Sequence, residues 1–471
     1  MPKKTLALII AAFALLTFAF PVNTARADPE ELGYTPYNDY FRLFDDNITH
    51  RLTVYISRAE WNGLIQDMKD YAEEDERMRT GRFRRADLVY EDEFGSMTIK
   101  DIGFRTRGNT TRIIPEDEKG YRRAHFSIKF DETFDHSPGT PEYKALKSRE
   151  FCELEGLDLK WNLWMDESHI RELYCLELLS EAGVTAPDVS LAALTIVIGG
   201  QSIDYGVYTI IEPIDKTFLT KRVGKQRSGG NLYKCLWENT CATLESAYPE
   251  DAIGVKDWQS GLRPSYDLKT NKDNPDTSDI KAFIYSINSL SDKDLAAYIE
   301  KNFKADGFLR MLAVNTLVGA CDDYRTMGNN YYLYFDKLGK AEMLPYDYDA
   351  SLGGGWSGEP PWSAKGIATA DIYEWFDLSE AFLEQSVSRP LLERLLAIDE
   401  YRERYEYYLD RFIEEGLFSF ESFREKFEAL RCLYEPYVCS DTEDEGEQMR
   451  LTNEEWFFEA KIKSVKAQLK G

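Results

Sequence analysis

Residues 322–349 read DDYRTMGNNYYLYFDKLGKAEMLPYDYD. Two acids and a pair of asparagines precede a run of strand-forming residues, and a Gly-Lys turn separates this run from a second apolar run that ends in acid-Tyr-acid. The pattern predicts a β-hairpin that brings amide and carboxylate oxygens together. Hard cations such as Mg²⁺ prefer these oxygens, usually with phosphate completing the shell. We therefore expect a metal site here; the alternative is a surface hairpin with solvated turn residues.

Protein kinases carry the same groups in the same order: an Asp that accepts the hydroxyl proton, an Asn on the metal, and a metal-binding Asp after a short hairpin. In this layout Asp323 is the catalytic carboxylate, with Asp322 as the alternative. The predicted metal ligands are Asn330 (in preference to Asn329), Asp347 and Asp349. The chain departs from ordinary kinases in having Cys-Asp-Asp for His-Arg-Asp and Asp-Tyr-Asp for Asp-Phe-Gly.

The chain also resembles the CotH family, the atypical protein kinases related to spore coat protein H. The matching segments occur in family order across roughly 45–410; they are RTRGNTTR at 105–112, HFSIKF at 125–130, GVYTIIE at 206–212, and NYYLY with LPYDYD within 330–349. The resemblance implies an atypical protein-kinase-like, two-lobed α+β fold. It also implies ATP with Mg²⁺ or Mn²⁺ as cofactors, and transfer of phosphate to Ser or Thr of a spore-coat, envelope or extracellular protein.

A lysine and a glutamate are the expected partners of the nucleotide phosphates. Lys129 lies in the HFSIKF segment, where the resemblance implies contact with the α and β phosphates. Glu172, in the first turn of the next predicted helix, is its expected ion-pair partner, and Glu212 is the alternative. Without that function, Lys129 is an exposed strand residue and Glu172 a first-turn acid favoured by the helix dipole.

Two further segments are expected to contact the nucleotide. Arg105, Arg107 and Asn109 lie in a basic segment with small residues, which predicts a phosphate-covering loop because arginine forks match phosphate oxygens. This loop lacks the G-x-G-x-x-G of ordinary kinases. Ile211 and Glu212 end a predicted strand and correspond to the hinge that meets the adenine; the proline that follows removes one backbone donor.

The order of predicted elements divides the chain into regions. Mainly antiparallel strands with one long helix predict the N-lobe, and largely helical periodicity predicts the C-lobe. A stretch rich in Gly, Ser, Asn, Asp and Pro predicts an irregular insertion. The predicted regions are a signal peptide at 1–27, a polar leader at 28–48, the N-lobe at 49–213, and the C-lobe at 214–471 with the insertion at 223–278.

The beginning of the chain has the pattern of a secretory signal peptide. Lys3 and Lys4 precede an apolar run at 6–20, and Ala25-Arg26-Ala27 is a small-x-small cleavage site. We expect cleavage after Ala27 and a secreted or envelope-associated protein with no membrane span after cleavage. The alternative is an uncleaved anchor, although the run is shorter than the ~20 residues that span a bilayer.

The net charge of the chain restricts the classes of macromolecule that it is expected to bind. The chain has 83 Asp and Glu against 57 Lys and Arg, a formal charge of −26, which argues against nonspecific nucleic-acid binding. Acidity is compatible with divalent cations and with a basic protein substrate.

The seven cysteines form no C-x-x-C pair, and their odd number leaves at least one free or paired between chains.

The sequence is compatible with three functions. The first is an exported protein kinase, the second is AMP transfer or a related nucleotide-driven modification on the same fold, and the third is a non-catalytic surface-binding or adhesion module. Binding alone does not need a lysine, an asparagine and two aspartates of the kinase pattern together, so their joint presence favours an enzyme. The sequence does not separate phosphoryl transfer from AMP transfer.

Overall fold

The computed structural model describes residues 40–72, 78–109, 111–162, 166–238, 240–257, 260–354, 361–375, 380, 387–442 and 447–470. The predicted signal peptide and its cleavage site after Ala27 lie outside these ranges, as does most of the predicted leader. Across the described ranges, no helix is both long and apolar enough to cross a bilayer. All seven cysteines lie within the ranges and none is in a disulfide.

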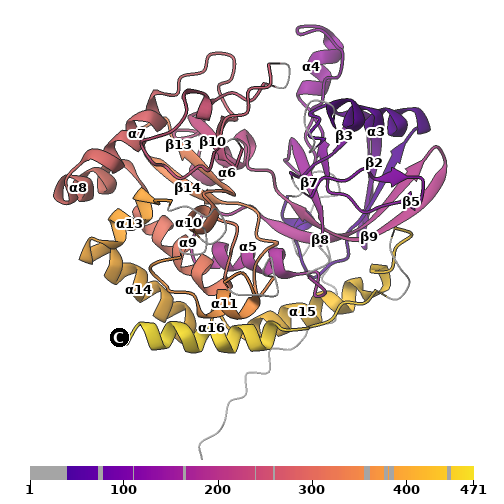
Figure 1. The fold of residues 1–471 in the computed structure, drawn as a ribbon. Coiled ribbons are helices and arrows are strands. Elements are labelled where there is room, and N and C mark those ends of the chain that lie inside the picture. Colours follow the sequence, from indigo (N-terminus) through magenta and orange to yellow (C-terminus); the bar gives the residue numbers. More distant parts are fainter. Residues whose placement is uncertain are drawn as a thin grey trace, which may run out of the picture. The chain divides into compact units, whose positions relative to one another are not determined.

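The first half of the chain forms a closed seven-stranded β-barrel (Figure 1). In barrel order its strands are β1 (Arg51–Ile56), β2 (Arg84–Asp92), β3 (Gly95–Thr106), β6 (Phe126–Lys129), β7 (Gly156–Trp161), β9 (Gln201–Ile211) and β8 (Val189–Ile198). Six of the pairs are antiparallel, but β1 pairs with β8 in parallel and closes the barrel. The expectation of a mainly antiparallel N-lobe therefore holds for most pairs, while the closed form was not predicted.

Alternation of apolar and polar residues decides which side chains fill the barrel. Leu157 and Leu159 of β7 are fully buried in its apolar core, together with Phe126 and Ile128 of β6. Their strand neighbours lie on the other face of the sheet, because successive side chains of a strand point to opposite faces. The other elements of this half are α2 (Tyr40–Leu43), α3 (Arg58–Ala72), β4 (Glu116–Asp117), β5 (Gly120–Tyr121), α4 (Pro141–Lys147) and α5 (Arg171–Glu181).

The second half combines a five-stranded sheet with helices. In sheet order the strands are β11 (Ile253–Gly254), β12 (Tyr266–Leu268), β10 (Asn231–Cys235), β13 (Tyr331–Phe335) and β14 (Ala341–Pro345). The predicted hairpin is confirmed as β13 and β14, in antiparallel register from Tyr331↔Pro345 to Phe335↔Ala341. The segment 223–278 is not wholly irregular, because β10, β11 and β12 come from it and join the sheet of that hairpin.

Helices form most of the remaining described residues of the second half. They are α6 (Lys216–Val223), α7 (Ser278–Ser289), α8 (Asp292–Asn302), α9 (Ala305–Val318), α10 (Tyr324–Met327), α11 (Ala364–Thr369), α13 (Pro390–Leu396), α14 (Asp399–Glu414), α15 (Phe420–Tyr434) and α16 (Glu454–Gln468), with short 3₁₀ turns η1 (Glu250–Ala252) and η2 (Glu435–Tyr437). Helix α9 is buried almost throughout, and α14 and α16 both contact it.

Helix α5 is fixed at its first residue by a buried ion pair. The Arg171 guanidinium donates to Glu454 Oε1 of α16 over 2.7 Å, and the two side chains are 2% and 0% exposed. A second bond runs from Arg171 Nη2 to Asn453 Oδ1 over 3.1 Å. The pair thus links the start of α5, where Glu172 lies, to the C-terminal helix.

We expect Arg171→Leu to lower the free energy of unfolding by about 3–5 kcal/mol, because Glu454 would keep a buried charge without its partner. Equilibrium urea denaturation measures this change. The matched control is Arg402→Leu, which breaks an exposed pair with Asp399 and should cost less than about 1 kcal/mol. Equal losses for the two variants would show that the buried pair does not hold α5.

Candidate active site

The candidate site is centred on Lys160 of β7, whose ammonium lies among three carboxylates. Its Nζ is 2.7 Å from Glu172 Oε2, 2.5 Å from Asp347 Oδ1 and 3.2 Å from Asp349 Oδ2. Oxygen atoms of the three acids lie within 4.8 Å of one another. The four side chains come from a barrel strand, from the first turn of α5 and from the segment after β14, so the site joins both halves of the chain.

The backbone conformation and hydrogen bonds of the turn after β14 place Asp347 beside Lys160. Asp347 has φ +65°, a left-handed conformation that is uncommon for a residue with a side chain. The next backbone N–H, that of Tyr348, donates to Glu172 Oε1 over 3.2 Å. Tyr348 OH in turn donates to Asn315 Oδ1 of α9 over 2.6 Å. These bonds hold the turn after β14 against both α5 and α9.

The acids around Lys160 differ in their protonation. Burial alone would lower the pKa of Lys160, but Asp347, Asp349 and Glu172 hold it well above its ordinary value. Burial would raise the pKa of Asp347, but the ammonium of Lys160 lowers it instead. For Asp349, burial and the neighbouring Asp347 raise the pKa despite Lys160. Asp347 is therefore the acid that stays ionised most readily.

The oxygen donors of the site fit a hard divalent cation. Besides the carboxylates, Asn330 directly precedes β13; its Nδ2 donates to Asp322 O over 3.0 Å, and its Oδ1 has no protein donor within the described ranges. Asn329 uses both ends of its amide: Oδ1 accepts from Trp237 N over 2.8 Å and Nδ2 donates to Asp322 Oδ1 over 3.0 Å. Asn330 therefore keeps an amide oxygen available for a ligand, whereas Asn329 uses its amide to position Asp322.

Of the two adjacent acids, Asp323 lies in a structural network. It caps α10, accepts from Arg325 Nε over 2.6 Å and from Asn315 Nδ2 over 2.7 Å, and is 5% exposed. Asp322 is partly exposed, and burial, Asp347 and Asp323 raise its pKa to about 7 although Asn329 opposes the shift. The structure therefore places Asp322, the alternative, beside the predicted metal ligands, and gives Asp323 other partners.

The predicted pair of Lys129 with Glu172 does not form. Lys129 Nζ is 3.0 Å from Glu132 and 3.9 Å from Asp131, and its side chain is 37% exposed. Glu212, the alternative partner, accepts instead from Arg222 over 2.8 Å. Lys160 was missed because residues 156–161, GLDLKW, were not identified as a strand. Their Leu-Asp-Leu-Lys alternation, on the last strand before the helix of Glu172, is the signal that identifies it.

The predicted phosphate-covering segment begins at the end of β3 and continues into the loop after it. Arg107 ion-pairs with Asp158 over 3.2 Å and donates to Tyr346 OH, directly before Asp347. Arg105, two residues earlier on the strand, places its guanidinium 4.8 Å from the Phe83 ring centroid. Of these two residues, Arg107 is the one whose contacts reach the candidate metal ligands.

Asn109, the third predicted residue of that segment, lies in a contact between the two halves. Its Oδ1 accepts from Arg79 over 3.2 Å, and Arg79 also ion-pairs with Glu238 over 2.7 Å. Lys256 donates to the same Glu238 carboxylate over 2.8 Å. Asn109 is thus tied to a buried ion-pair network rather than directed at Asp347.

The predicted hinge residues end β9. Ile211 is paired with Asp158 on one side and Val189 on the other. Glu212 is 1% exposed, its backbone N–H donates to Asp188 O over 2.9 Å, and its carboxylate accepts from Asp188 N and from Arg222. The Glu212 N–H is therefore already used within the protein and is not free to bind an adenine.

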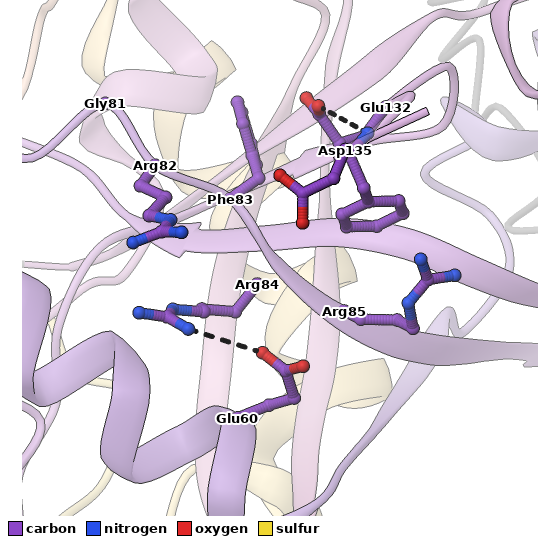
Figure 2. Close-up of a pocket in the computed structure, with 9 residues that line it drawn as sticks. Glu60, Gly81, Arg82, Phe83, Arg84, Arg85, Glu132 and Asp135 are labelled. Atoms are coloured by element: carbon purple, nitrogen blue, oxygen red, sulfur yellow. Dashed lines mark hydrogen bonds and ion pairs between the residues drawn. The ribbon is translucent and has the colours of Figure 1, made fainter. Parts of the chain in front are cut away.

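A separate cavity of about 280 Å³ lies beside β2 (Figure 2). Its lining residues are Glu60, Gly81, Arg82, Phe83, Arg84, Arg85, Glu132, Phe134 and Asp135. Each of the three arginines has an acidic partner: Arg82 and Arg84 pair with Asp67, and Arg85 pairs with Asp101. The positive charges of the three arginines are therefore balanced by acidic side chains, so this cavity is a weak candidate for an anion site.

Comparison with known proteins supports a kinase relationship. Residues 104–460, about three quarters of the chain, match the family described as CotH kinase protein. No curated protein matches the sequence. A solved structure of the HipA–HipB toxin–antitoxin system with its operator DNA, from Shewanella oneidensis MR-1, aligns with 13% identity and a TM-score of 0.21 over 61% of this chain and 60% of that chain.

We expect Lys160→Met to lower the free energy of unfolding by roughly 1–3 kcal/mol at neutral pH, because three clustered carboxylates would lose their common donor. Urea denaturation in the presence of EDTA measures the loss. Lys129→Met is the control, since an exposed i,i+3 pair contributes less than about 1 kcal/mol. A larger loss for the Lys129 variant would contradict the assignment of Lys160 as the central cation.

Proposed function

The chain belongs to the CotH kinase family, and we propose that it transfers the γ-phosphoryl group of ATP to a Ser or Thr hydroxyl of a protein. One observation carries the proposal: Lys160 contacts Glu172 on the helix after its strand and the two acids that follow the β13–β14 hairpin. Protein kinases use a strand lysine, a helix glutamate and a metal-binding Asp after a hairpin in this combination.

Each group of the site has a proposed role in that reaction. Lys160 and Arg107 bind phosphate oxygens, and Glu172 holds Lys160 in place. Asp347, Asp349 and Asn330 hold Mg²⁺ or Mn²⁺; a bound ion would neutralise charge on the phosphate oxygens. Phosphoryl transfer depends mainly on such positioning and electrostatic stabilisation.

Asp322 is proposed to orient the acceptor hydroxyl and accept its proton. Two observations support this role: Asp322 is partly exposed, and Asn329 donates to its carboxylate over 3.0 Å. Burial and the neighbouring acids also raise the pKa of Asp322 to about 7. A general base works best when its pKa lies near the operating pH. Asp323 supports the loop through Arg325 instead.

The acceptor is proposed to be a secreted, envelope or spore-coat protein. Two expectations motivate this: the predicted signal peptide at 1–27 and the resemblance to spore coat protein H. The formal charge of −26 favours an acceptor with a basic surface, since opposite charge accelerates encounter between proteins.

We expect the chain from Asp28 onward to gain phosphoryl groups, or to phosphorylate a basic Ser-containing peptide, when incubated with ATP and Mg²⁺ or Mn²⁺. Intact-mass analysis separates phosphoryl from adenylyl additions. Asp347→Asn and Asp322→Asn should each reduce the rate roughly 100-fold or more. Asp323→Asn should mainly lower stability, because it weakens the Asp323–Arg325 pair.

The other outcomes are equally informative. Adenylyl additions would replace the proposal with AMP transfer. No addition, together with no rise in unfolding temperature on adding ATP and Mn²⁺, would indicate a binding module. A rate that falls with Asp323→Asn but not with Asp322→Asn, at equal stability, would return the catalytic role to Asp323.

A further inference from the structure

A second lysine approaches the candidate site from the C-lobe sheet. Lys234 is in the middle of β10, in register with Tyr332 of β13 and Asp267 of β12. Its Nζ lies 4.0 Å from the ring centroid of Tyr346 and 5.7 Å from that of Tyr332. The two rings are packed edge to face, with centroids 5.3 Å apart, so they form a fixed aromatic surface under the ammonium.

Tyr346 places Lys234 next to the residues already assigned to phosphate and metal. The Tyr346 hydroxyl accepts from Arg107, the residue directly after β3, and Asp347 follows Tyr346 in the chain. Arg107, directly after a barrel strand, and Lys234, on a strand of the five-stranded sheet, therefore contact the same tyrosine. Burial, with Arg107 and Lys269 nearby, lowers the pKa of Lys234 to about 7.

Lys234 differs from the other lysines of the site in its lack of an acidic partner. Lys160 contacts three carboxylates and Lys129 contacts Glu132, but no carboxylate of the described ranges lies within 4.0 Å of the Lys234 ammonium. Asp158 and Asp347 are near enough to oppose the shift of the Lys234 pKa but do not contact its ammonium. A cation held against an aromatic surface, close to other cations and with no acid in direct contact, is costly unless an anion joins it. Its three N–H donors remain available for that anion.

We propose that Lys234 binds the phosphate chain of the nucleotide opposite Arg107 and holds it beside Asp347. The inference rests on the proposed function, and it adds a C-lobe lysine to the groups that fix the nucleotide. Arg107 and Lys234 would then contact phosphate oxygens from two sides, in addition to the contact proposed for Lys160.

The experiment measures binding of two probes, a non-hydrolysable ATP analogue with Mg²⁺ and inorganic tripolyphosphate, by isothermal titration calorimetry. We expect Lys234→Met to weaken both roughly 10- to 100-fold, the effect of one charge-assisted contact. Lys221→Met is the matched control: its ammonium lies 3.6 Å from the Tyr40 ring centroid, away from the site residues named above, and its loss should leave both affinities unchanged.

A second measurement avoids any folding defect of the variant. In the wild-type protein, tripolyphosphate should protect Lys234, but not the half-exposed Lys147 of α4, from acetylation by acetic anhydride, read by peptide mass spectrometry. Unchanged affinity of a folded Lys234→Met variant, or no protection of Lys234, would overturn the inference. If the wild type binds tripolyphosphate through Lys234 but not the ATP analogue, the anion site stands and the proposed kinase function fails.

Discussion

The contact of one ammonium with three carboxylates determines how the parts of this protein must meet. The side chains of Lys160 and Glu172 are 6% and 5% exposed. Water cannot hydrate either charge well if the other is removed, so each charge depends on its partner. The barrel strand, helix α5 and the turn after β14 must all be in register for the contact to form. The buried Arg171–Glu454 pair also helps to position Glu172, because it links the first turn of α5 to α16.

A second network keeps the site's unusual backbone in place. Asn330 and Asp347 both have positive φ, at +51° and +65°, which costs free energy for residues with side chains. Asn315 accepts from Tyr348 and donates to Asp323, and Asp323 pairs with Arg325. The acid that looked catalytic in the sequence thus helps to hold the turn that presents Asp347.

Local patterns in the sequence predicted the parts of the fold that depend on local order. The hairpin was found because its strands are adjacent and its turn is short, and the mixed two-part architecture followed from periodicity. Barrel closure was not predictable in this way, since β1 at Arg51–Ile56 pairs in parallel with residues 193–198, far along the chain. The segment of β10 to β12 shows only short strand-like pieces among turn-forming residues, so the sequence did not predict that they join the sheet of the hairpin.

Local sequence patterns also fail to predict which single side chains meet at the site. Lys129 and Lys160 both lie on strands between apolar residues, on the neighbouring strands β6 and β7, and it is Lys160 that contacts Glu172. The net charge of the chain does not predict the local charge at the site either. The formal charge is −26, yet Arg107, Lys160 and Lys234 all lie near Asp347. Under the proposed function, the overall acidity would favour a basic protein acceptor and the local group of cations would bind a polyanionic nucleotide, so the two charge requirements of a kinase would be met in different places.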